Sequence, residues 1–416
     1  MSGALPASFA IDAATARVRL DQHDPAFVAD PYVAFAATRA LGPAFFWEDH
    51  RLWCFTEAEA VNALLRDRRL GREILHVATR EELGMPEEPA HTRPFYDLDR
   101  LTMLSREPPA HTRLRTLVNR AFVSRQIERL RPRIATLCHR LIDGFEAAGS
   151  VDLIAAFATP IPVTIIAEMM GVPVDMAPQL LDWSHRMVAM YQFGRSTETE
   201  LSAVAATEAF VGFLRGYVAE RRGAPADDLI SVLIAAEADG ERLSEDELIA
   251  SCILLLNAGH EATVHSIGNA VKAILESGLD TAGWFARPGG PEAVAEEALR
   301  FDPPLHLFQR YVLEPCEIAG IAFSKGDSLG LLLGAANRDA ARFADPDRFD
   351  PARPVRPHLA FGAGIHFCIG APLARLELEV ALPILFERLP RLALAGAPRY
   401  RDSWHFHGLE RLDVAW

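Results

Sequence analysis

The chain of 416 residues lacks the features that mark several large classes of protein. Its cysteines are few, at positions 54, 138, 252, 316 and 368, and no two of them form a CxxC pair. That pattern argues against a disulfide framework or a zinc knuckle and fits a reducing compartment. Basic residues number 42 against 56 acidic ones, for a net charge of −14, so a nucleic-acid partner has no electrostatic support.

Long apolar runs are also missing. The most apolar stretch, residues 249–256, is too short to cross a bilayer. Residues 1–20 contain no continuous apolar core of the kind that a signal peptide needs. We therefore expect a cytoplasmic protein with neither a membrane nor a nucleic-acid partner.

The chain contains no internal repeat and no low-complexity linker, which predicts a single domain over residues 1–416. Apolar residues recur at helical spacing through most of residues 132–276. Strand patterns are short: residues 45–47 and 52–55 predict one hairpin, and residues 317–323 and 329–333 predict a second. The expected fold class is mainly α with a small β portion.

One long helix is predicted from Ser244, where serine and Glu247 form a capping box, to residue 276. Its apolar middle indicates a helix that crosses the core, yet the centre carries Gly259 and Glu261. A helical glycine costs roughly 1 kcal/mol. Glu261 could simply pair with a surface cation. Alternatively, this helix flank lies close to a flat group, with polar side chains that move protons there.

The most informative segment is F-G-x-G-x-H-x-C-x-G over residues 361–370. Its glycines permit a tight turn, and Pro372 suits the first turn of a helix that follows. A sulfur just before a helix N-terminus lies near unpaired N–H donors, which favours the thiolate over the thiol. Cys368 could therefore be a nucleophile, a metal ligand or an axial haem ligand, although many single cysteines are only buried and inert.

Three further patterns carry charge. Glu297 and Arg300 lie at i,i+3 on a predicted helix and can form an ion pair, which Arg348 in a proline-bounded loop could join. His111 and Arg115, at i,i+4, can form an anion site. Arg310 begins a strand-like run and could supply another cation, and ordinary solvated charge is the alternative for each pattern. Taken with the cysteine turn, these motifs occur in the same order as in cytochrome P-450, a haem-thiolate monooxygenase of the bacterial type, which the chain resembles over nearly its whole length.

The resemblance implies a fold in which haem b lies between the long distal helix and the cysteine-bearing proximal loop of a triangular-prism helical domain. Cys368 would then be the metal ligand. The cofactor-binding residues that the resemblance implies are His111, Arg115, Arg310 and His366 at the propionates, Phe361 and Gly370 near the sulfur, and Ala258 and Gly259 on the distal side. Glu297, Arg300 and Arg348 would form a structural ion-pair cluster, and Glu261, Ala262 and Thr263 would be the catalytic residues.

The chain departs from the family pattern at one position. The residue after the distal acid is usually threonine, whose hydroxyl helps deliver protons to oxygen, but here it is Ala262, with Thr263 next. Successive helical residues point roughly 100° apart, so Thr263 would not replace the missing hydroxyl. We hypothesise that protons arrive through ordered water held by Glu261, or through a polar group on the substrate.

The resemblance also implies the reaction and its partners. One oxygen atom of O2 would be inserted into a small-molecule substrate, with electrons from a 2Fe–2S ferredoxin and its NAD(P)H-dependent reductase. Arg113 and Arg375 are candidates for a basic patch that binds the ferredoxin. Residues expected from the family's layout to line the substrate pocket are Phe95, Tyr96, Met103, Leu104, Met190, Tyr191, Phe193, Leu254, Leu305, His306, Leu307, Phe308, His405 and Phe406.

This lining predicts a mid-sized, mostly apolar substrate with one polar group, which His306 and His405 would meet. Two alternatives stay open, a peroxide-driven peroxygenase and a non-catalytic haem-binding sensor. Peroxide-using relatives tend to have arginine and proline where this chain has Glu261 and Ala262. A cysteine hydrolase built on Cys368 and His366 is disfavoured, because residues two apart on a turn seldom form a nucleophile–base pair.

Overall fold

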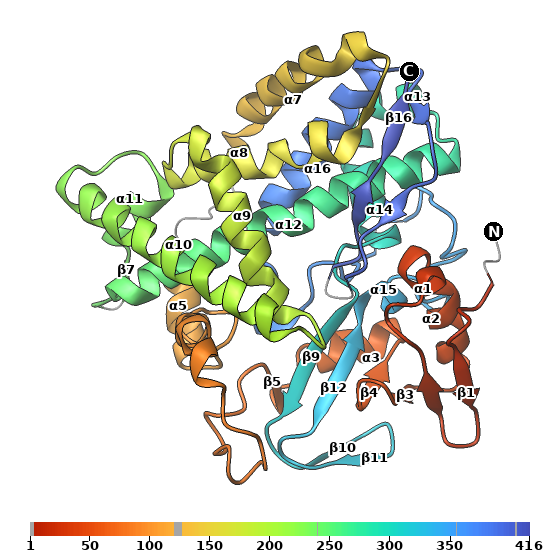
Figure 1. The fold of residues 1–416 in the computed structure, drawn as a ribbon. Helices are drawn as coiled ribbons and strands as arrows, with labels where there is room; N and C mark the ends of the chain where they lie inside the picture. The colour runs from red at the N-terminus through yellow and green to blue at the C-terminus, as the bar shows by residue number, and fades with distance from the viewer. Residues whose placement is uncertain (1–3, 120–126, 239, 355, 404–405) are drawn as a thin grey trace.

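The computed structural model describes residues 4–119, 127–238, 240–354, 356–403 and 406–416. Most of the helices gather in one part of the molecule, and the largest sheet lies beside them with the N-terminal helices (Figure 1). This arrangement confirms the predicted class, mainly α with a smaller β portion. No described helix is both long enough and apolar enough to cross a membrane.

The helical part is built around α12 (Glu245–Ser277), which runs through its middle (Figure 1). The predicted capping box is present: the Ser244 hydroxyl accepts from the Glu247 amide at 3.2 Å, and the Glu247 carboxylate accepts from the Ser244 amide at 2.9 Å. The helix ends at Gly278, whose φ of +66° is the left-handed conformation that glycine adopts freely. Around it pack α8 (Pro160–Met170), α9 (Ala177–Val188), α10 (Thr197–Gly223), α14 (Gly290–Phe301) and α16 (Ala371–Arg388).

The largest sheet has seven strands in the order β1-β2-β3-β4-β12-β9-β5. The strands are β1 (Ala10–Asp12), β2 (Arg17–Arg19), β3 (Ala44–Trp47), β4 (Leu52–Phe55), β5 (Leu70–Gly71), β9 (Leu307–Val312) and β12 (Ser328–Leu332). The predicted hairpin of β3 and β4 is confirmed, with Phe45 opposite Cys54.

The second predicted hairpin is wrong. The segment after Val312 folds on itself as β10 (Cys316–Ile318) and β11 (Ile321–Phe323), because Ala319 and Gly320 adopt φ of +51° and +77° and form a tight turn. β12 instead pairs antiparallel with β9 and parallel with β4. Its apolar residues are buried on both faces, which favours a central position in the sheet.

Side chains alternate between the two faces of this sheet. On β12, Leu329 and Leu331 pack with the buried face of α3 (Ala58–Leu64), whereas Leu332 packs with Phe27 and Phe35 of α1 (Pro25–Ala29) and α2 (Tyr32–Arg39). Two small hydrophobic cores therefore cover the sheet, and a larger one fills the helical part. Strand β9 lies beside the cysteine turn, since a Cβ added at Gly362 would lie 2.8 Å from the ring of its Phe308.

The remaining elements are short, apart from α7. The other helices are α4 (Arg93–Asp99), α5 (Ala110–Asn119), α7 (Arg131–Phe145), α11 (Leu229–Ala235), α13 (Thr281–Phe285) and α15 (Leu333–Ala336). The other strands are β6 (Ser150–Asp152), β7 (Glu237–Ala238), β8 (Glu241–Arg242), β13 (Ala393–Leu394), β14 (Arg399–Tyr400), β15 (Leu409–Arg411) and β16 (Asp413–Ala415). The described C-terminal segment therefore consists of short strands and loop.

Candidate active site

The cysteine turn has the backbone that its glycines predict. Gly362 and Gly364 adopt φ of +68° and +73°, in the left-handed region that disfavours other residues. A Cβ added at Gly362 would lie 2.8 Å from the ring of Phe308, so the close approach also requires glycine. The Cys368 amide donates to the Phe361 carbonyl at 3.0 Å, which closes the turn. α16 begins directly afterwards, and the cysteine lies at its N-terminal end.

Among the cysteines, Cys368 is exposed, whereas Cys54, Cys138 and Cys252 are buried. Protein atoms nevertheless surround its sulfur closely enough that burial raises the pKa of the thiol, while the amides of Gly370 and Ala371 and the nearby arginines act in the opposite direction. We expected the helix N-terminus to favour the thiolate; in the chain alone, desolvation outweighs that effect. A metal cation at the sulfur would reverse the balance, since a coordinating thiol is deprotonated outright.

Beside the turn, the structure brings together the four residues predicted to bind propionates. His111 and Arg115 lie on α5, and His366 lies on the turn, with 4.6 Å between the ring centroids of the two histidines. An Arg115 Nη2 donates to the Phe367 carbonyl at 2.7 Å, which holds α5 against the turn. Arg310, on β9, is close enough to His366 to lower its pKa, although burial is the larger cause of that shift.

Glu107 also belongs to this group, although no sequence pattern singles it out. Its carboxylate lies 3.0 Å from His366 Nε2 and accepts from the Arg72 amide at 2.7 Å. Burial raises the pKa of Glu107, but the His366 hydrogen bond and the Arg72 amide outweigh burial and leave that pKa lowered. A carboxylate just before a proline pair resembles an ordinary loop residue, and only the fold places it against the turn.

These residues fit a haem with two propionates. Arg310 is 2% exposed, and within the described ranges it has no carboxylate at ion-pair distance; its Nη1 donates to the adjacent Gln309 carbonyl at 2.9 Å. Burial, the largest cause, lowers the pKa of Arg310 to about 9. His111 is equally buried, and neither ring nitrogen makes a hydrogen bond of standard geometry with the residues described. Buried cationic and polar donors of this kind call for an anionic partner.

The first prediction concerns this cradle. Replacing Arg310 with methionine should raise the dissociation constant for haem about 10- to 100-fold, because a hydrogen bond to a charged group contributes about 1.5–3 kcal/mol. Haem transfer to a high-affinity scavenger protein measures the change. Arg399→Met is the matched control, since Arg399 is 63% exposed and pairs with Glu410. Equal haem retention by both variants would contradict the assignment of Arg310 to the cradle.

The predicted ion-pair cluster is present with one correction. Glu297 and Arg300 form two hydrogen bonds of 2.7 Å each, and both residues are buried. The prediction that Arg348 is the third member is wrong, because its side chain is 66% exposed and pairs with Asp350. Arg353 replaces it, with Nε 3.5 Å from Glu297 Oε2. The loop turns at Asp345, where φ is +46°, and this bend directs Arg348 outward while the chain returns inward at Arg353.

The predicted distal residues lie in the middle of α12. Thr263 Oγ1 donates to the Gly259 carbonyl at 3.1 Å within the helix, so this hydroxyl is already used. A Cβ added at Gly259 would meet only Ile166, at 3.7 Å, which leaves one side of the helix open there. Ala258 and Ala262 are the other small residues of this stretch. Next to Glu261, the helix therefore has a flat surface formed by small residues.

Glu261 is 2% exposed and lies among histidines and Arg401. Its Oε1 is 2.8 Å from His185 Nε2 on α9, and its Oε2 is 3.5 Å from His265 Nε2 and 3.9 Å from an Arg401 nitrogen. Burial raises the pKa of Glu261, but hydrogen bonds from His185 and His265 outweigh burial and hold that pKa below its usual range. The His185 side chain is 39% exposed, so the buried carboxylate is linked to the surface. Neither His185 nor Arg401 is predicted here from the sequence, because both lie far from Glu261 along the chain.

The predicted pocket residues are not all together. Phe95 and Tyr191 stack edge to face with centroids 5.9 Å apart and join Met103, Met190, Tyr96 and Leu254 in or against the main core. Phe193 is exposed and packs on His50 instead. Leu307 and Phe308 belong to the two sheet cores, Leu104 and Leu305 are partly buried, and Phe406 contacts His265. His405 lies outside the described residues.

His306 is a further correction. It is 0% exposed and lies 3.2 Å from the Tyr32 hydroxyl and 3.9 Å from Asp302, on the side of the N-terminal helices. It is therefore not a polar group of the pocket around Phe95 and Tyr191. The residue follows a Pro-Pro step, which redirects the chain before β9 begins, and no sequence signal indicates that turn.

Comparisons with known proteins agree on the family. A family model described as Cytochrome P450 matches residues 292–391. Cytochrome P450 107B1 of Saccharopolyspora erythraea is 40% identical over 87% of this chain and 88% of its own length, and the 6-deoxyerythronolide B hydroxylase of the same organism is 36% identical over 95% and 98%. A solved structure of P450BioI with hexadec-9Z-enoic acid ligated acyl carrier protein has a TM-score of 0.87 and 32% identity, covering 94% of this chain and 99% of that one. The chain belongs to the cytochrome P450 family, whose members bind haem b through a cysteine thiolate.

Proposed function

We propose that this cytochrome P450 monooxygenase inserts one oxygen atom of O2 into a mid-sized, mostly apolar substrate, using electrons from a separate 2Fe–2S ferredoxin. The observation that carries the proposal is the pairing of Cys368 on its turn with the buried cradle of Arg310, His111 and His366. When bound, haem supplies the activation of O2, and a thiolate ligand favours O–O cleavage. The chain supplies orientation, exclusion of water and protons.

Apolar and aromatic side chains support the substrate class. Phe95 and Met190 are each 3% exposed. The Tyr191 hydroxyl donates to Asp99 at 2.8 Å, so the aromatic ring of Tyr191 is the part that is available for packing. One relative is a 6-deoxyerythronolide B hydroxylase, and one similar solved structure is a complex with a hexadecenoic acid ligated to acyl carrier protein. A hexadecenoic acid is a long apolar chain that ends in one carboxyl group. A substrate of this size, with one polar group that fixes its orientation, fits such a lining.

The electron donor in this proposal is a ferredoxin served by an NAD(P)H-dependent reductase. The two arginines suggested for docking are each paired already: Arg113 with Glu247 and Glu241, and Arg375 with Glu296 at 2.5 Å. These carboxylates largely neutralise the two arginines, so binding of the proposed ferredoxin does not depend on a basic patch there. The exposed apolar side chains of Ile365 and Phe367 on the cysteine turn support a docking face there instead.

The proposal is tested by comparing oxidants on the haem-loaded enzyme. A chemical library is first screened by difference spectroscopy for compounds that displace iron-bound water. With such a compound, product should form with ferredoxin, reductase, NAD(P)H and O2, and at less than a tenth of that rate with hydrogen peroxide alone. Equal turnover with peroxide would favour the peroxygenase alternative. Binding without any turnover would favour the sensor.

Glu261 is the proposed source of protons, through ordered water between the carboxylate and bound oxygen. Glu261→Gln should lower product formation about 10- to 100-fold, because a positioned acid–base group contributes at least that much. Thr263→Val should change it less than about twofold, because the Thr263 hydroxyl is bonded to Gly259 within the helix. Product formed per NAD(P)H consumed is measured for both variants and for Ala262→Thr. Loss of coupling in Thr263→Val, with Glu261→Gln unaffected, would refute this route.

A further inference from the structure

The carboxylate of Glu261 has three histidine neighbours, and the arrangement of two of them, His185 and His260, goes beyond an ion pair. His185 on α9, and His260 and Glu261 on α12, each offer one nitrogen or oxygen atom, and these three atoms lie within 4.8 Å of one another. We call these three residues the His–Glu cluster. Two of its members are buried, whereas the His185 side chain is 39% exposed and gives access from solvent.

His260 has the orientation of a metal-binding imidazole. Its Nδ1 lies 2.9 Å from the Leu256 carbonyl, an acceptor, so Nδ1 carries the ring proton and Nε2 presents a lone pair. Among the residues that the structure describes, Nε2 has no hydrogen-bond partner, although His260 is 1% exposed. The atom that it faces, Glu261 Oε1 at 3.8 Å, is also an acceptor. Glu261 Oε1 already has a partner in His185 Nε2 at 2.8 Å, so the unpartnered group is the buried lone pair of His260 Nε2, which a bound cation would satisfy.

The distances suit zinc. With Zn–N and Zn–O bonds of about 2.0–2.2 Å, the ligand atoms of a tetrahedral site lie roughly 3.3–3.5 Å apart. Here Glu261 Oε1 is 3.8 Å from His260 Nε2, close to this spacing, and 2.8 Å from His185 Nε2, a hydrogen bond whose proton a bound ion would replace. Two imidazoles and a carboxylate favour Zn²⁺ over Mg²⁺ or Ca²⁺, which prefer oxygen ligands.

Outer contacts complete the site. The Leu256 carbonyl orients His260, and His265 Nε2 lies 3.5 Å from the second oxygen of Glu261. Such partners fix the direction of metal ligands and raise their affinity. We propose that His185, His260 and Glu261 bind a Zn²⁺ ion that ties α9 to α12, with water in the fourth position.

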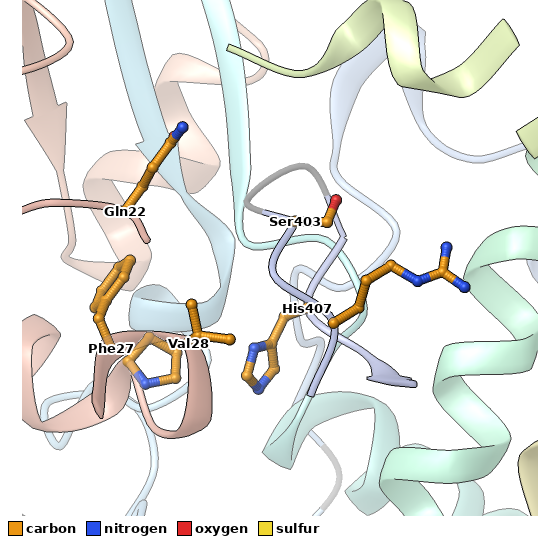
Figure 2. A pocket seen from close by; sticks show the side chains of 7 residues that line it. Gln22, Phe27, Val28, Ser403 and His407 are labelled. Carbon is orange, nitrogen blue, oxygen red and sulfur yellow. The ribbon is translucent and has the colours of Figure 1, made fainter. Parts of the chain in front are cut away.

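A second group of possible ligands, Asp302, His306 and His407, does not support the same conclusion. The hydroxyls of Tyr32 and Tyr400 already donate to Asp302, at 2.7 Å and 3.3 Å. His407 faces a small pocket between α1 and the C-terminal segment, together with Phe27 and Val28 (Figure 2). This group is satisfied by protein hydrogen bonds and needs no cation.

Zinc in the His–Glu cluster would occupy the carboxylate to which we assign proton delivery. If that assignment is correct, bound zinc should slow product formation and chelation should restore the rate. This consequence rests on the proposed function, whereas zinc binding does not. The binding test below therefore distinguishes failure of the zinc site from failure of the proposed function.

The experiment titrates chelator-treated, haem-loaded enzyme with ZnCl2 in competition with a chromophoric chelator. We expect one zinc per chain, and at least about tenfold weaker binding in His185→Asn and His260→Asn. His76→Asn is the matched control, because it removes an exposed histidine outside the cluster and should leave the affinity unchanged. The ferrous–carbon monoxide spectrum of each variant reports whether the fold and haem site are intact.

X-ray absorption at the zinc edge of the wild-type enzyme gives a second readout that needs no variant. The expected shell contains two imidazole nitrogens with oxygen, and no sulfur. Sulfur in the shell, or equal affinity in wild type and both cluster variants, would overturn the proposal. The proposal would also be overturned if the wild-type enzyme bound zinc no more tightly than His260→Asn does, whatever the carbon monoxide spectrum shows.

Discussion

Replacing Cys368 with serine is expected to lower substrate oxidation at least about a hundredfold, while the variant still folds. The sulfur is the group that our account assigns to the iron, and a hydroxyl cannot supply the electron density with which a thiolate favours O–O cleavage. The cradle of Arg310, His111 and His366 is unchanged in this variant, so the protein should still bind haem. Product formation with ferredoxin, reductase and O2 measures the loss.

The control for this prediction is Cys316→Ser. Cys316 lies on β10 and is partly buried, in a two-stranded hairpin away from the turn. Its replacement should leave the rate unchanged within about twofold. Full activity in Cys368→Ser, with haem bound, would show that another group binds the iron or that the reaction does not need it.

Removing Arg300 is expected to be the most damaging change to stability. Its guanidinium forms two hydrogen bonds with Glu297 and two more with the Asn337 and Pro346 carbonyls, at 2.8 and 3.0 Å, and it is 2% exposed. Breaking a buried pair leaves an uncompensated charge and costs about 3–5 kcal/mol. Arg300→Ala should therefore lower the free energy of unfolding by that amount, as measured by denaturant titration of the haem-loaded protein.

Arg348→Ala provides a sharp control, because sequence reasoning put both arginines in one cluster. The exposed Arg348 side chain pairs with Asp350, and such a surface pair contributes at most about 1 kcal/mol. Arg353→Ala should cost more than Arg348→Ala, since Arg353 approaches Glu297. Equal losses from Arg300→Ala and Arg348→Ala would contradict the arrangement described here.

The parts of the site that could be predicted are those fixed by local spacing. The turn around Cys368, the capping box at Ser244 and the Glu297–Arg300 pair depend on residues within a few positions of each other. Their geometry follows from backbone angles and helical periodicity alone. The order of these motifs along the chain was enough to indicate the family.

The parts that were missed depend on how loops fold. Arg353 and Arg348 are five residues apart in one loop, and only its bend decides which of them reaches Glu297. His185 meets Glu261 because α9 crosses α12, a contact that no spacing encodes. The pairing of β12 with β9 and β4 has the same origin. In each case a long-range contact outweighs the local pattern.

The direct test of the whole account is the carbon monoxide difference spectrum of the reduced wild-type protein. Coordination of haem iron by the Cys368 thiolate predicts the strongly red-shifted Soret band that is characteristic of a cysteinate ligand. A correctly folded, haem-loaded protein whose band lacks this shift would contradict the central claim, and the proposed monooxygenase chemistry would fall with it.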